Sequence, residues 1–203
     1  MEPLKYDLPD FSIMEQVDSN NFFVWQPDDL YIVLGRANSI EKALHMQVAQ
    51  EDNVKIFKRP TGGESVVLSP QMVVFSARFT KKQGEKPGAF FIRINSCLIE
   101  ELSKLGIENL TSKGISDLSL GGKKIMGSSM YLKGDLLFYH AVINVSEDVS
   151  KISKYLKHPS KEPDYRKGRS HEEFVTSLHK EGYFIDNKEV MRCVESALSK
   201  LGK

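Results

Sequence analysis

Residues 59–66 read Arg-Pro-Thr-Gly-Gly-Glu-Ser-Val and follow a short apolar run at residues 54–57, which predicts a strand leading directly into a glycine-rich loop. Glycine tolerates positive φ and has no side chain, so the main-chain amides of such a loop approach an anion closely. A Walker loop or a dinucleotide-binding loop needs a helix directly after its glycines. Here residues 65–68 and 72–79 predict a hairpin across Ser69-Pro70, so neither of these nucleotide-binding folds is indicated.

A second glycine-containing segment, residues 117–129, reads Asp-Leu-Ser-Leu-Gly-Gly-Lys-Lys-Ile-Met-Gly-Ser-Ser. It opens a predicted meander of three antiparallel strands over residues 118–145, with tight turns at residues 121–122 and 133–135. A lysine beside a glycine turn supplies a mobile point charge, although most lysines on exposed hairpins are solvated and have no chemical role.

Strand alternation places the two lysines of the second segment on opposite faces. Lys124, Met126 and Ser128 fall on one face of a regular strand, and Lys123 and Ile125 fall on the other. Alternation by itself separates the two lysines and does not say which one is functional.

Composition limits the classes of protein to which the chain can belong. It has 203 residues, 40% hydrophobic and 27% charged, which is enough to bury a core as one domain over residues 1–203. With 28 basic and 27 acidic side chains the formal net charge is +1, which predicts neither a nucleic-acid nor a membrane partner. Two cysteines, no signal-like N-terminus and no membrane-length apolar run predict a cytoplasmic protein with reduced thiols.

Helices are predicted by apolar spacing and by capping residues. A capping-box pattern at Asn38 and Glu41 predicts one helix running toward Gln50, and helical spacing predicts another over residues 91–105. Ser146 and Ser170 are cap candidates for the C-terminal helices. The last helix has one apolar stripe, which consists of Val190, Cys193, Val194, Ala197, Leu198 and Leu201.

The first loop resembles that of the lipoate-protein ligase, octanoyltransferase and biotin-protein ligase superfamily, which reads Arg-Arg-x-Ser/Thr-Gly-Gly-Gly-x-Val-x-His-Asp. The chain keeps Arg59, Thr61, Gly62, Gly63 and Val66, and it departs from the pattern at Lys58, Glu64, Leu68 and Ser69. A carboxylate at Glu64 would repel a nucleotide phosphate unless it points away or helps to hold magnesium.

The second segment is similar to the family pattern Asn-Asp-x-Gly-Lys/Arg-Lys-x-x-Gly-Ser/Asn-Ala, with a few residues between the aspartate and the first glycine. It matches at Asp117, Lys124, Gly127 and Ser128, so that Lys124 falls on the family's catalytic lysine. His140 lies in a strand similar to the family's His-Gly-x-Ile/Leu-Leu strand, near the acyl pocket. A lone strand histidine is more often a hydrogen-bonded core residue than a catalyst, and we interpret His140 in that way.

The resemblance, closest to the catalytic domain of lipoate-protein ligase A, implies an α+β, class II synthetase-like fold. This fold has a central, mostly antiparallel sheet and a smaller sheet, both flanked by helices. It implies a single catalytic domain without the C-terminal accessory domain, so that either a second polypeptide supplies that domain or the chain is a short member of the family. The implied reaction converts lipoate or octanoate and ATP, as its Mg²⁺ complex, to acyl-AMP. The acyl group then passes to a lysine of a lipoyl-acceptor domain in a 2-oxoacid dehydrogenase E2 component or a glycine cleavage H protein.

The resemblance also implies the roles of individual residues. Lys124 is the catalytic residue, and no residue is a metal ligand. The implied substrate- and nucleotide-binding residues are Arg59, Thr61, Gly62, Gly63, Glu64, Ser65, Val66, Val67, Asp117, Gly127, Ser128 and His140.

Two alternatives to ligase activity stay open on the sequence. An ATP-independent octanoyl or lipoyl transferase would need a cysteine near the catalytic lysine, and neither Cys97 nor Cys193 falls where such a cysteine is expected. A non-catalytic acyl-binding protein would explain the departures from the first motif. The charged loop at residues 159–170 is either a surface loop or a cover over bound substrate, in which Arg166 or Arg169 would offer forked donors to phosphate.

Overall fold

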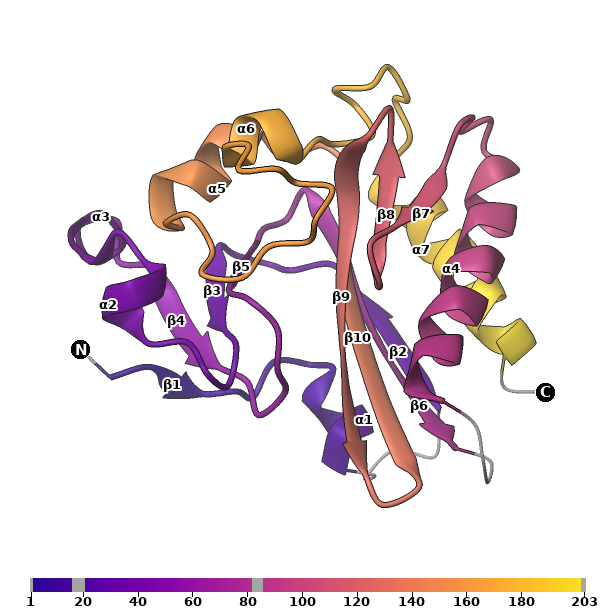
Figure 1. The fold of residues 1–203 in the computed structure, drawn as a ribbon, viewed down its shortest axis with the longest axis horizontal. Helices are drawn as coiled ribbons and strands as arrows, with labels where there is room; N and C mark the ends of the chain where they lie inside the picture. Colours follow the sequence, from indigo (N-terminus) through magenta and orange to yellow (C-terminus); the bar gives the residue numbers. More distant parts are fainter. Residues whose placement is uncertain (1, 16–20, 82–85, 202–203) are drawn as a thin grey trace.

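The computed structural model describes residues 2–15, 21–81 and 86–201. Within these ranges it contains a six-stranded antiparallel sheet, the large sheet, and a four-stranded mixed sheet, the small sheet, with helices packed against both (Figure 1). The predicted α+β class, with a central antiparallel sheet and a smaller sheet flanked by helices, is confirmed. In the described ranges no helix combines the length and the apolar character needed to cross a bilayer.

The large sheet has the strand order β2-β6-β10-β9-β8-β7, and all of its neighbouring strands are antiparallel. Its strands are β2 (Phe22–Trp25), β6 (Met72–Thr80), β7 (Thr111–Lys113), β8 (Asp117–Leu120), β9 (Lys123–Lys133) and β10 (Leu136–Asn144). Strands β8 to β10 form the predicted meander, which is confirmed. Their turns contain Gly121, Gly122 and Gly134, all at positive φ, which glycine adopts without steric cost.

The small sheet has the order β1-β4-β3-β5, with β1 and β3 parallel to β4 and β5 antiparallel to β3. Its strands are β1 (Leu4–Lys5), β3 (Tyr31–Leu34), β4 (Lys55–Lys58) and β5 (Val66–Leu68). The predicted hairpin between β5 and β6 is wrong, because β5 pairs with β3 and β6 joins the large sheet. Val67 packs into the outer core of the small sheet and Leu68 packs between the sheets, so β5 is buried on both faces.

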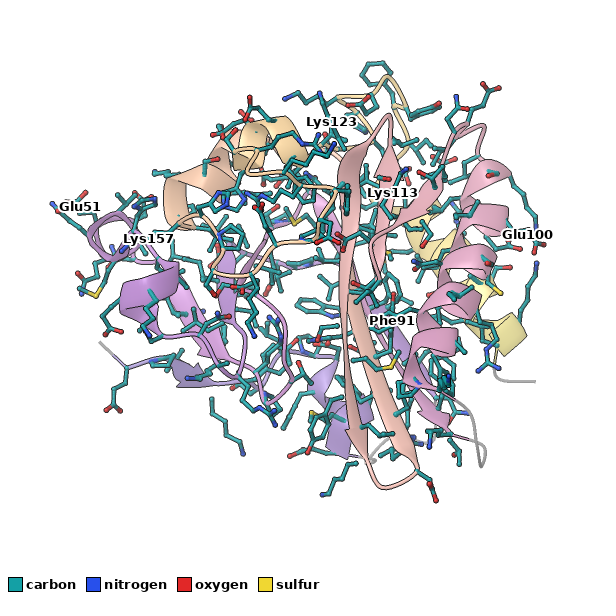
Figure 2. The ribbon with its side chains drawn as sticks, viewed as in Figure 1. Glu51, Phe91, Glu100, Lys113, Lys123 and Lys157 are labelled. Carbon is teal, nitrogen blue, oxygen red and sulfur yellow. The ribbon has the colours of Figure 1, made fainter. Side chains whose placement is uncertain are left out.

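Seven helices occupy the described ranges. They are α1 (Phe11–Glu15), α2 (Ile40–Ala43), α3 (Met46–Glu51), α4 (Pro87–Ser103), α5 (Val149–Tyr155), α6 (His171–Phe174) and α7 (Asn187–Leu201). Helices α4 and α7 bury their apolar faces against the large sheet. Figure 2 shows Phe91 on the sheet side of α4, where its ring lies 5.9 Å from that of Tyr139.

Two helix predictions need correction. The predicted single helix toward Gln50 is broken into α2 and α3, because Leu44 takes an extended conformation and pairs with Leu156. The Asn38 capping box is wrong, since Ser39 is the N-cap residue and makes no side-chain cap bond.

The caps of the later helices divide in the same way. Ser146 does not cap α5, because Asp148 accepts the bond from the amide of Ser150. Ser170 does cap α6, through a full capping box with Glu173.

Candidate functional site

A cavity of about 550 Å³ lies between the two sheets. Its walls come from β3, residues 63–68, β6, β9 and β10, and residues 159–175 close one side. Figure 1 shows the chain between α5 and α6 running from the helices of the small sheet toward β9. We call residues 59–66 the glycine loop and residues 157–170 the covering segment.

Arg59 organises the glycine loop from within. Its side chain is only 4% exposed, and its Nη2 donates to the carbonyl oxygens of Gly62 at 2.9 Å and Glu64 at 2.8 Å. Nε also donates to the Gly62 oxygen, and Nη1 reaches the Val33 oxygen at 3.4 Å. Burial lowers the pKa of Arg59 to about 10, so its guanidinium stays charged at neutral pH. The positive charge that the sequence suggested for a phosphate is engaged with the protein's own carbonyls.

Gly63 and Gly35 allow the glycine loop to fold tightly. Gly63 has φ +89°, and a Cβ there would lie 3.0 Å from Nη2 of Arg59 and 3.3 Å from Cβ of Ser129. A Cβ on Gly35 would clash with the Gly63 carbonyl oxygen at 1.9 Å, so only glycine fits at position 35. By contrast, a Cβ on Gly62 would meet no atom within 4 Å. The two glycines of the pair therefore have different functions.

His140 and Ser129 tie the glycine loop to the large sheet. These residues are register partners on β10 and β9, and Nε2 of His140 lies 2.9 Å from both the Ser129 and the Thr61 hydroxyl oxygens. Ser129 also donates to the Gly62 carbonyl oxygen at 3.1 Å. Burial, assisted by the charge of Arg59, holds the pKa of His140 well below its usual value. His140 is therefore a neutral, hydrogen-bonded residue on the cavity wall.

Lys124 projects toward the same cavity from the start of β9. Its Nζ lies 2.9 Å from Oδ1 of Asp117, while Oδ2 of Asp117 accepts a 2.8 Å hydrogen bond from Tyr165. A Cβ on Gly127 would lie 2.7 Å from Cε and 2.8 Å from Nζ of Lys124, so the absence of a side chain at Gly127 leaves room for the lysine. Burial and the Asp117 carboxylate raise the pKa of Tyr165, which keeps its hydroxyl a donor.

The orientation of Lys124 follows from a β-bulge and not from regular alternation. The register between β8 and β9 shifts so that Leu118 pairs with Met126 while Ser119 pairs with Lys124. Consecutive Ile125 and Met126 consequently both join the core under α4 and α7. The predicted shared face of Lys124, Met126 and Ser128 is wrong, because Lys124 lies over Gly127. Lys123, labelled in Figure 2, does not appear among the described residues that line the cavity.

Glu64 joins the glycine loop to the covering segment. Its Oε1 accepts bonds of 3.2 Å from the Ser160 hydroxyl and from the Lys161 amide, and Oε2 accepts a 3.1 Å bond from Asn38. At the position of the family's third glycine, this chain therefore has a carboxylate that accepts hydrogen bonds from three groups of the protein. Asn38, which the sequence assigned to a helix cap, instead lies beside the glycine loop, with its side-chain oxygen 3.2 Å from the Gly35 amide nitrogen.

A buried polar group at Tyr6 was missed by the sequence reading. Tyr6 lines the cavity and donates to Asp10 at 2.7 Å, and Ser76 donates to the same carboxylate at 2.6 Å. Burial raises the pKa of Asp10, which is wholly enclosed. Nothing in the local sequence pattern around Tyr6 and Asp10 identifies an inward-facing aspartate.

The cavity brings together eleven of the residues that the sequence singled out. They are Arg59, Gly63, Glu64, Ser65, Val66, Val67, Asp117, Lys124, Gly127, Ser128 and His140. Thr61 and Gly62 are not on the wall, and they contact it through His140 and Ser129.

Neither cysteine lies among the described residues of the cavity wall. Cys97 is on α4 and Cys193 on α7, both partly buried against the far side of the large sheet. Burial raises the pKa of both thiols, which disfavours the reactive thiolate.

The described residues contain no cluster of three or more His, Cys, Asp or Glu side chains arranged to hold a metal ion. Mg²⁺ commonly binds through one or two carboxylates together with substrate phosphates. Asp117, Glu162 and Glu64 are the carboxylates on the described cavity wall, and each already accepts a bond from another part of the protein.

Sequence comparison relates the chain to enzymes that attach lipoyl or octanoyl groups to proteins. A family model described as the lipoyl protein ligase A/B catalytic domain matches residues 11–199. Lipoate-protein ligase A of Psychrobacter cryohalolentis is 30% identical over 145 residues, covering 71% of this chain and 41% of that protein. Octanoyltransferase LipM of Carboxydothermus hydrogenoformans is 27% identical over 176 residues, covering 78% of this chain and 64% of that protein. The chain thus spans less than two thirds of the length of these relatives.

Solved structures with the same fold include lipoate-protein ligase A bound with ATP, at a TM-score of 0.77 and 18% identity, covering 98% of this chain and 85% of that one. A bipartite lipoate protein ligase from Thermoplasma acidophilum, described with its E2 lipoyl domain, also has a TM-score of 0.77, at 17% identity and with coverages of 98% and 83%. At such low identity the likeness shows the fold, and the predicted ligase-type catalytic fold is confirmed.

Proposed function

The chain belongs to the lipoyl protein ligase A/B catalytic domain family, and we propose that it is an ATP-dependent lipoate-protein ligase domain. It would activate lipoate or octanoate as acyl-AMP and transfer the acyl group to a lysine of a lipoyl domain, in an E2 component or an H protein, in the cytoplasm. The observation that carries the proposal is one cavity lined by both the Gly63 backbone and the Lys124 side chain. Polar and apolar side chains line the same cavity, which suits an amphipathic acid and a nucleotide.

The acyl chain would lie between the sheets, where Val33, Leu68, Val74 and Val142 line the cavity. Burial of these methylenes would supply the binding energy, about 0.8 kcal/mol for each CH₂ removed from water. The carboxylate would then point toward Lys124. His140 would border the acyl site as a neutral wall residue that keeps the glycine loop in place.

Lys124 would act on charge and position, not on protons. A carboxylate oxygen attacks the α-phosphorus, the bond to the β-phosphate oxygen breaks, and pyrophosphate leaves with that electron pair. The Lys124 ammonium would stabilise the charge that develops on the phosphoryl oxygens, with Asp117 holding it in place from 2.9 Å. In the second step the acceptor lysine amine attacks the acyl carbonyl and AMP leaves. Mg²⁺ would arrive with the polyphosphate and screen its charge.

We assign Arg59 to holding the glycine loop, since its donors engage the carbonyls of Val33, Gly62 and Glu64. The loop would contribute its backbone at Gly63 to the ligand. Ser65, Val66 and Val67 would continue this wall along the acyl chain.

The position of the cysteines favours the ligase over a transferase. A transferase that forms an acyl-thioester needs a thiolate at the acyl carbonyl, and Cys97 and Cys193 are both on the helices behind the large sheet. Because one of the relatives is an octanoyltransferase, the experiment below also tests for transferase activity.

The decisive measurement is acyl-dependent exchange of pyrophosphate into ATP, with lipoate and with octanoate. The unaltered chain should exchange with at least one acid, and Lys124→Ala should lower the rate by about 100-fold or more because a transition-state cation is lost. Lys123→Ala is the matched control and should keep the rate. If neither lipoate nor octanoate supports exchange, the proposal is contradicted. Acyl transfer that stops on thiol alkylation would identify a transferase, and acyl binding without turnover would identify a binding protein.

A further inference from the structure

Tyr6 lies where the N-terminal chain passes from the small sheet to the large sheet. Strand β1 pairs with β4 of the small sheet, and α1, which comes next, packs against β6 of the large sheet (Figure 1). Tyr6 directly follows β1, is only 4% exposed, and lines the cavity. The cavity between the sheets is therefore bounded there by a segment that belongs to neither of the two glycine-containing motifs.

Two contacts fix the Tyr6 side chain. Its hydroxyl donates to Oδ1 of Asp10 at 2.7 Å, and its ring meets the Phe11 ring edge-on, with the ring centres 6.0 Å apart. The other Asp10 oxygen accepts a 2.6 Å bond from the Ser76 hydroxyl. Asp10 is wholly enclosed, so a displaced Tyr6 would take a donor from a carboxylate that water does not reach. Tyr6 is therefore held firmly in its place.

Tyr6 separates the cavity from the Asp10 carboxylate. Ser76 is the register partner of His140, which lines the cavity, whereas neither Ser76 nor Asp10 appears among the described residues of the cavity wall. The open space therefore ends at Tyr6, with the carboxylate behind it. An apolar chain that advanced further would have to displace a hydrogen-bonded ring and then meet a buried polar group, and both steps are costly.

The strand register gives the length available between Lys124 and Tyr6. A Cβ on Gly127 would lie 2.8 Å from Nζ of Lys124, so the ammonium lies over Gly127. Counted through the pairing of β9, β10 and β6, Ser76 is two strands across from Gly127 and two residues along. These steps amount to about 10 Å across the sheet and about 7 Å along it, or about 12 Å on the diagonal.

This span limits a straight acyl chain. At about 1.5 Å for each carbon–carbon bond, the seven bonds of octanoate reach at most about 11 Å, and the eleven bonds of dodecanoate reach at most about 17 Å. With its carboxylate at Lys124, an extended octanoate thus ends before Tyr6, and an extended dodecanoate runs into it.

We propose that Tyr6 is the floor of the acyl site and the specificity-determining residue that stops longer chains. This inference rests on the proposed function and names the residue that limits its acyl substrate. Asp10 and Ser76 are positioning residues, because their hydrogen bonds hold the Tyr6 ring across the end of the site.

The test measures the affinity of the full chain for octanoate and for dodecanoate by calorimetry, without ATP. Each buried methylene adds about fourfold to affinity, so a site with room for four more would bind dodecanoate about 200-fold more tightly than octanoate. With Tyr6 in place, dodecanoate should bind no more tightly than octanoate. Tyr6→Ala removes the floor and should raise the ratio of dodecanoate affinity to octanoate affinity about tenfold or more.

Three further variants separate a floor from a general loss of structure. Tyr6→Leu keeps an apolar side chain, folds more readily than Tyr6→Ala, and should raise the ratio by a smaller factor. Tyr6→Phe keeps the ring and loses the bond to Asp10, so it should lower the urea midpoint and keep the ratio within about twofold. Tyr183→Ala removes a tyrosine outside the described cavity wall and should leave the ratio unchanged.

The outcomes separate this inference from the proposed function. An unchanged ratio in Tyr6→Ala and Tyr6→Leu overturns the inference, even if both acids bind more weakly, because Tyr6 then only supports the fold. Dodecanoate binding far more tightly than octanoate in the unaltered chain also overturns it. A chain that lacks acyl-dependent exchange yet shows the shifted ratio loses the proposed function and keeps the floor. A chain that exchanges with an unchanged ratio keeps the function and loses the floor.

Discussion

The glycine loop and the covering segment close the same cavity in opposite ways. In the glycine loop, Arg59 is engaged with three carbonyls, and Ser129 and His140 bind the loop to β9 and β10. In the covering segment, no described residue accepts a bond from the buried Nη2 of Arg166, and Glu64 reaches the segment through two bonds of 3.2 Å. Each side-chain nitrogen of Arg59 donates a bond, whereas Arg166 is enclosed with one nitrogen unpaired among the described residues.

This difference shows that the presence of an arginine does not identify a binding residue. Both Arg59 and Arg166 are 4% exposed and line the cavity, so burial and position do not distinguish them. The number of donors already engaged does.

The largest effect should come from Gly35→Ala, which disrupts the glycine loop. The new Cβ would overlap the Gly63 carbonyl oxygen, so the glycine loop must shift, and we expect a loss of about 3 kcal/mol of unfolding free energy. Urea denaturation measures this loss. Gly62→Ala is the matched control, because its Cβ meets open space and should change stability by less than about 1 kcal/mol, if anything upward. Equal stability of the two variants would contradict the described packing.

Arg59→Met tests whether Arg59 is structural. It should cost about 2 kcal/mol, because the carbonyl oxygens of Val33 and Glu64 lose their donor inside the protein. Arg36→Met, an exposed arginine nearby, should stay within about 0.5 kcal/mol of the unaltered chain. If Arg59→Met keeps full stability and loses only nucleotide affinity, Arg59 is a ligand residue and the contrast with Arg166 fails.

The pH dependence of stability tests the His140 contact. Its folded pKa is depressed and its unfolded pKa is about 6.5, so the unfolded state binds the extra proton first. Stability should therefore be constant above pH 6.5 and fall below it, by at most about 1.4 kcal/mol per pH unit.

His140→Gln removes this contribution, so its stability should fall less between pH 7 and 5.5. His171, whose pKa burial also lowers, is present in both proteins and cancels in the comparison. Parallel curves would show that His140 is not held neutral in the folded protein.

The smallest effect on stability belongs to Glu64, which links the two regions. Glu64→Ala should cost no more than about 1 kcal/mol, because its bonds to Ser160 and Lys161 are exposed. The same change should speed amide hydrogen exchange at Lys161, whose donor loses its acceptor. Glu64→Gln retains an acceptor oxygen and should preserve most of the protection. Unchanged exchange in Glu64→Ala would mean that other contacts hold the covering segment.

The parts of the fold that were predictable are those with local causes. Glycine turns fix the β8–β10 meander, and Ser170 with Glu173 fixes the start of α6, because the residues that make these contacts are close in sequence. The hairpin at Ser69-Pro70 was wrong for the opposite reason. The two strands do turn there, but β5 finds a better partner in β3, which allows both of its faces to be buried.

The candidate site divides in the same way. Lys124 was chosen over Lys123 from the family pattern, with strand alternation as support. The lysine does line the cavity, but a bulge at Ile125 and the space over Gly127 produce that orientation. Bulges depend on pairing between strands, so a single strand's pattern does not reveal them. Tyr6 and Asp10 gave no local signal, since their burial is caused by β6 and the cavity wall.

The amino-acid sequence alone determined the turns of the β8–β10 meander, the two glycine-containing segments and the charged residues beside them. These depend on φ preference and on apolar spacing, which are properties of neighbouring residues. The tertiary structure decided which of those charged side chains donate to other parts of the protein. A donor is free or engaged according to the carbonyls that reach it from distant segments, so only the packed chain separates Arg59, which completes its own loop, from Arg166, whose Nη2 has no partner among the described residues.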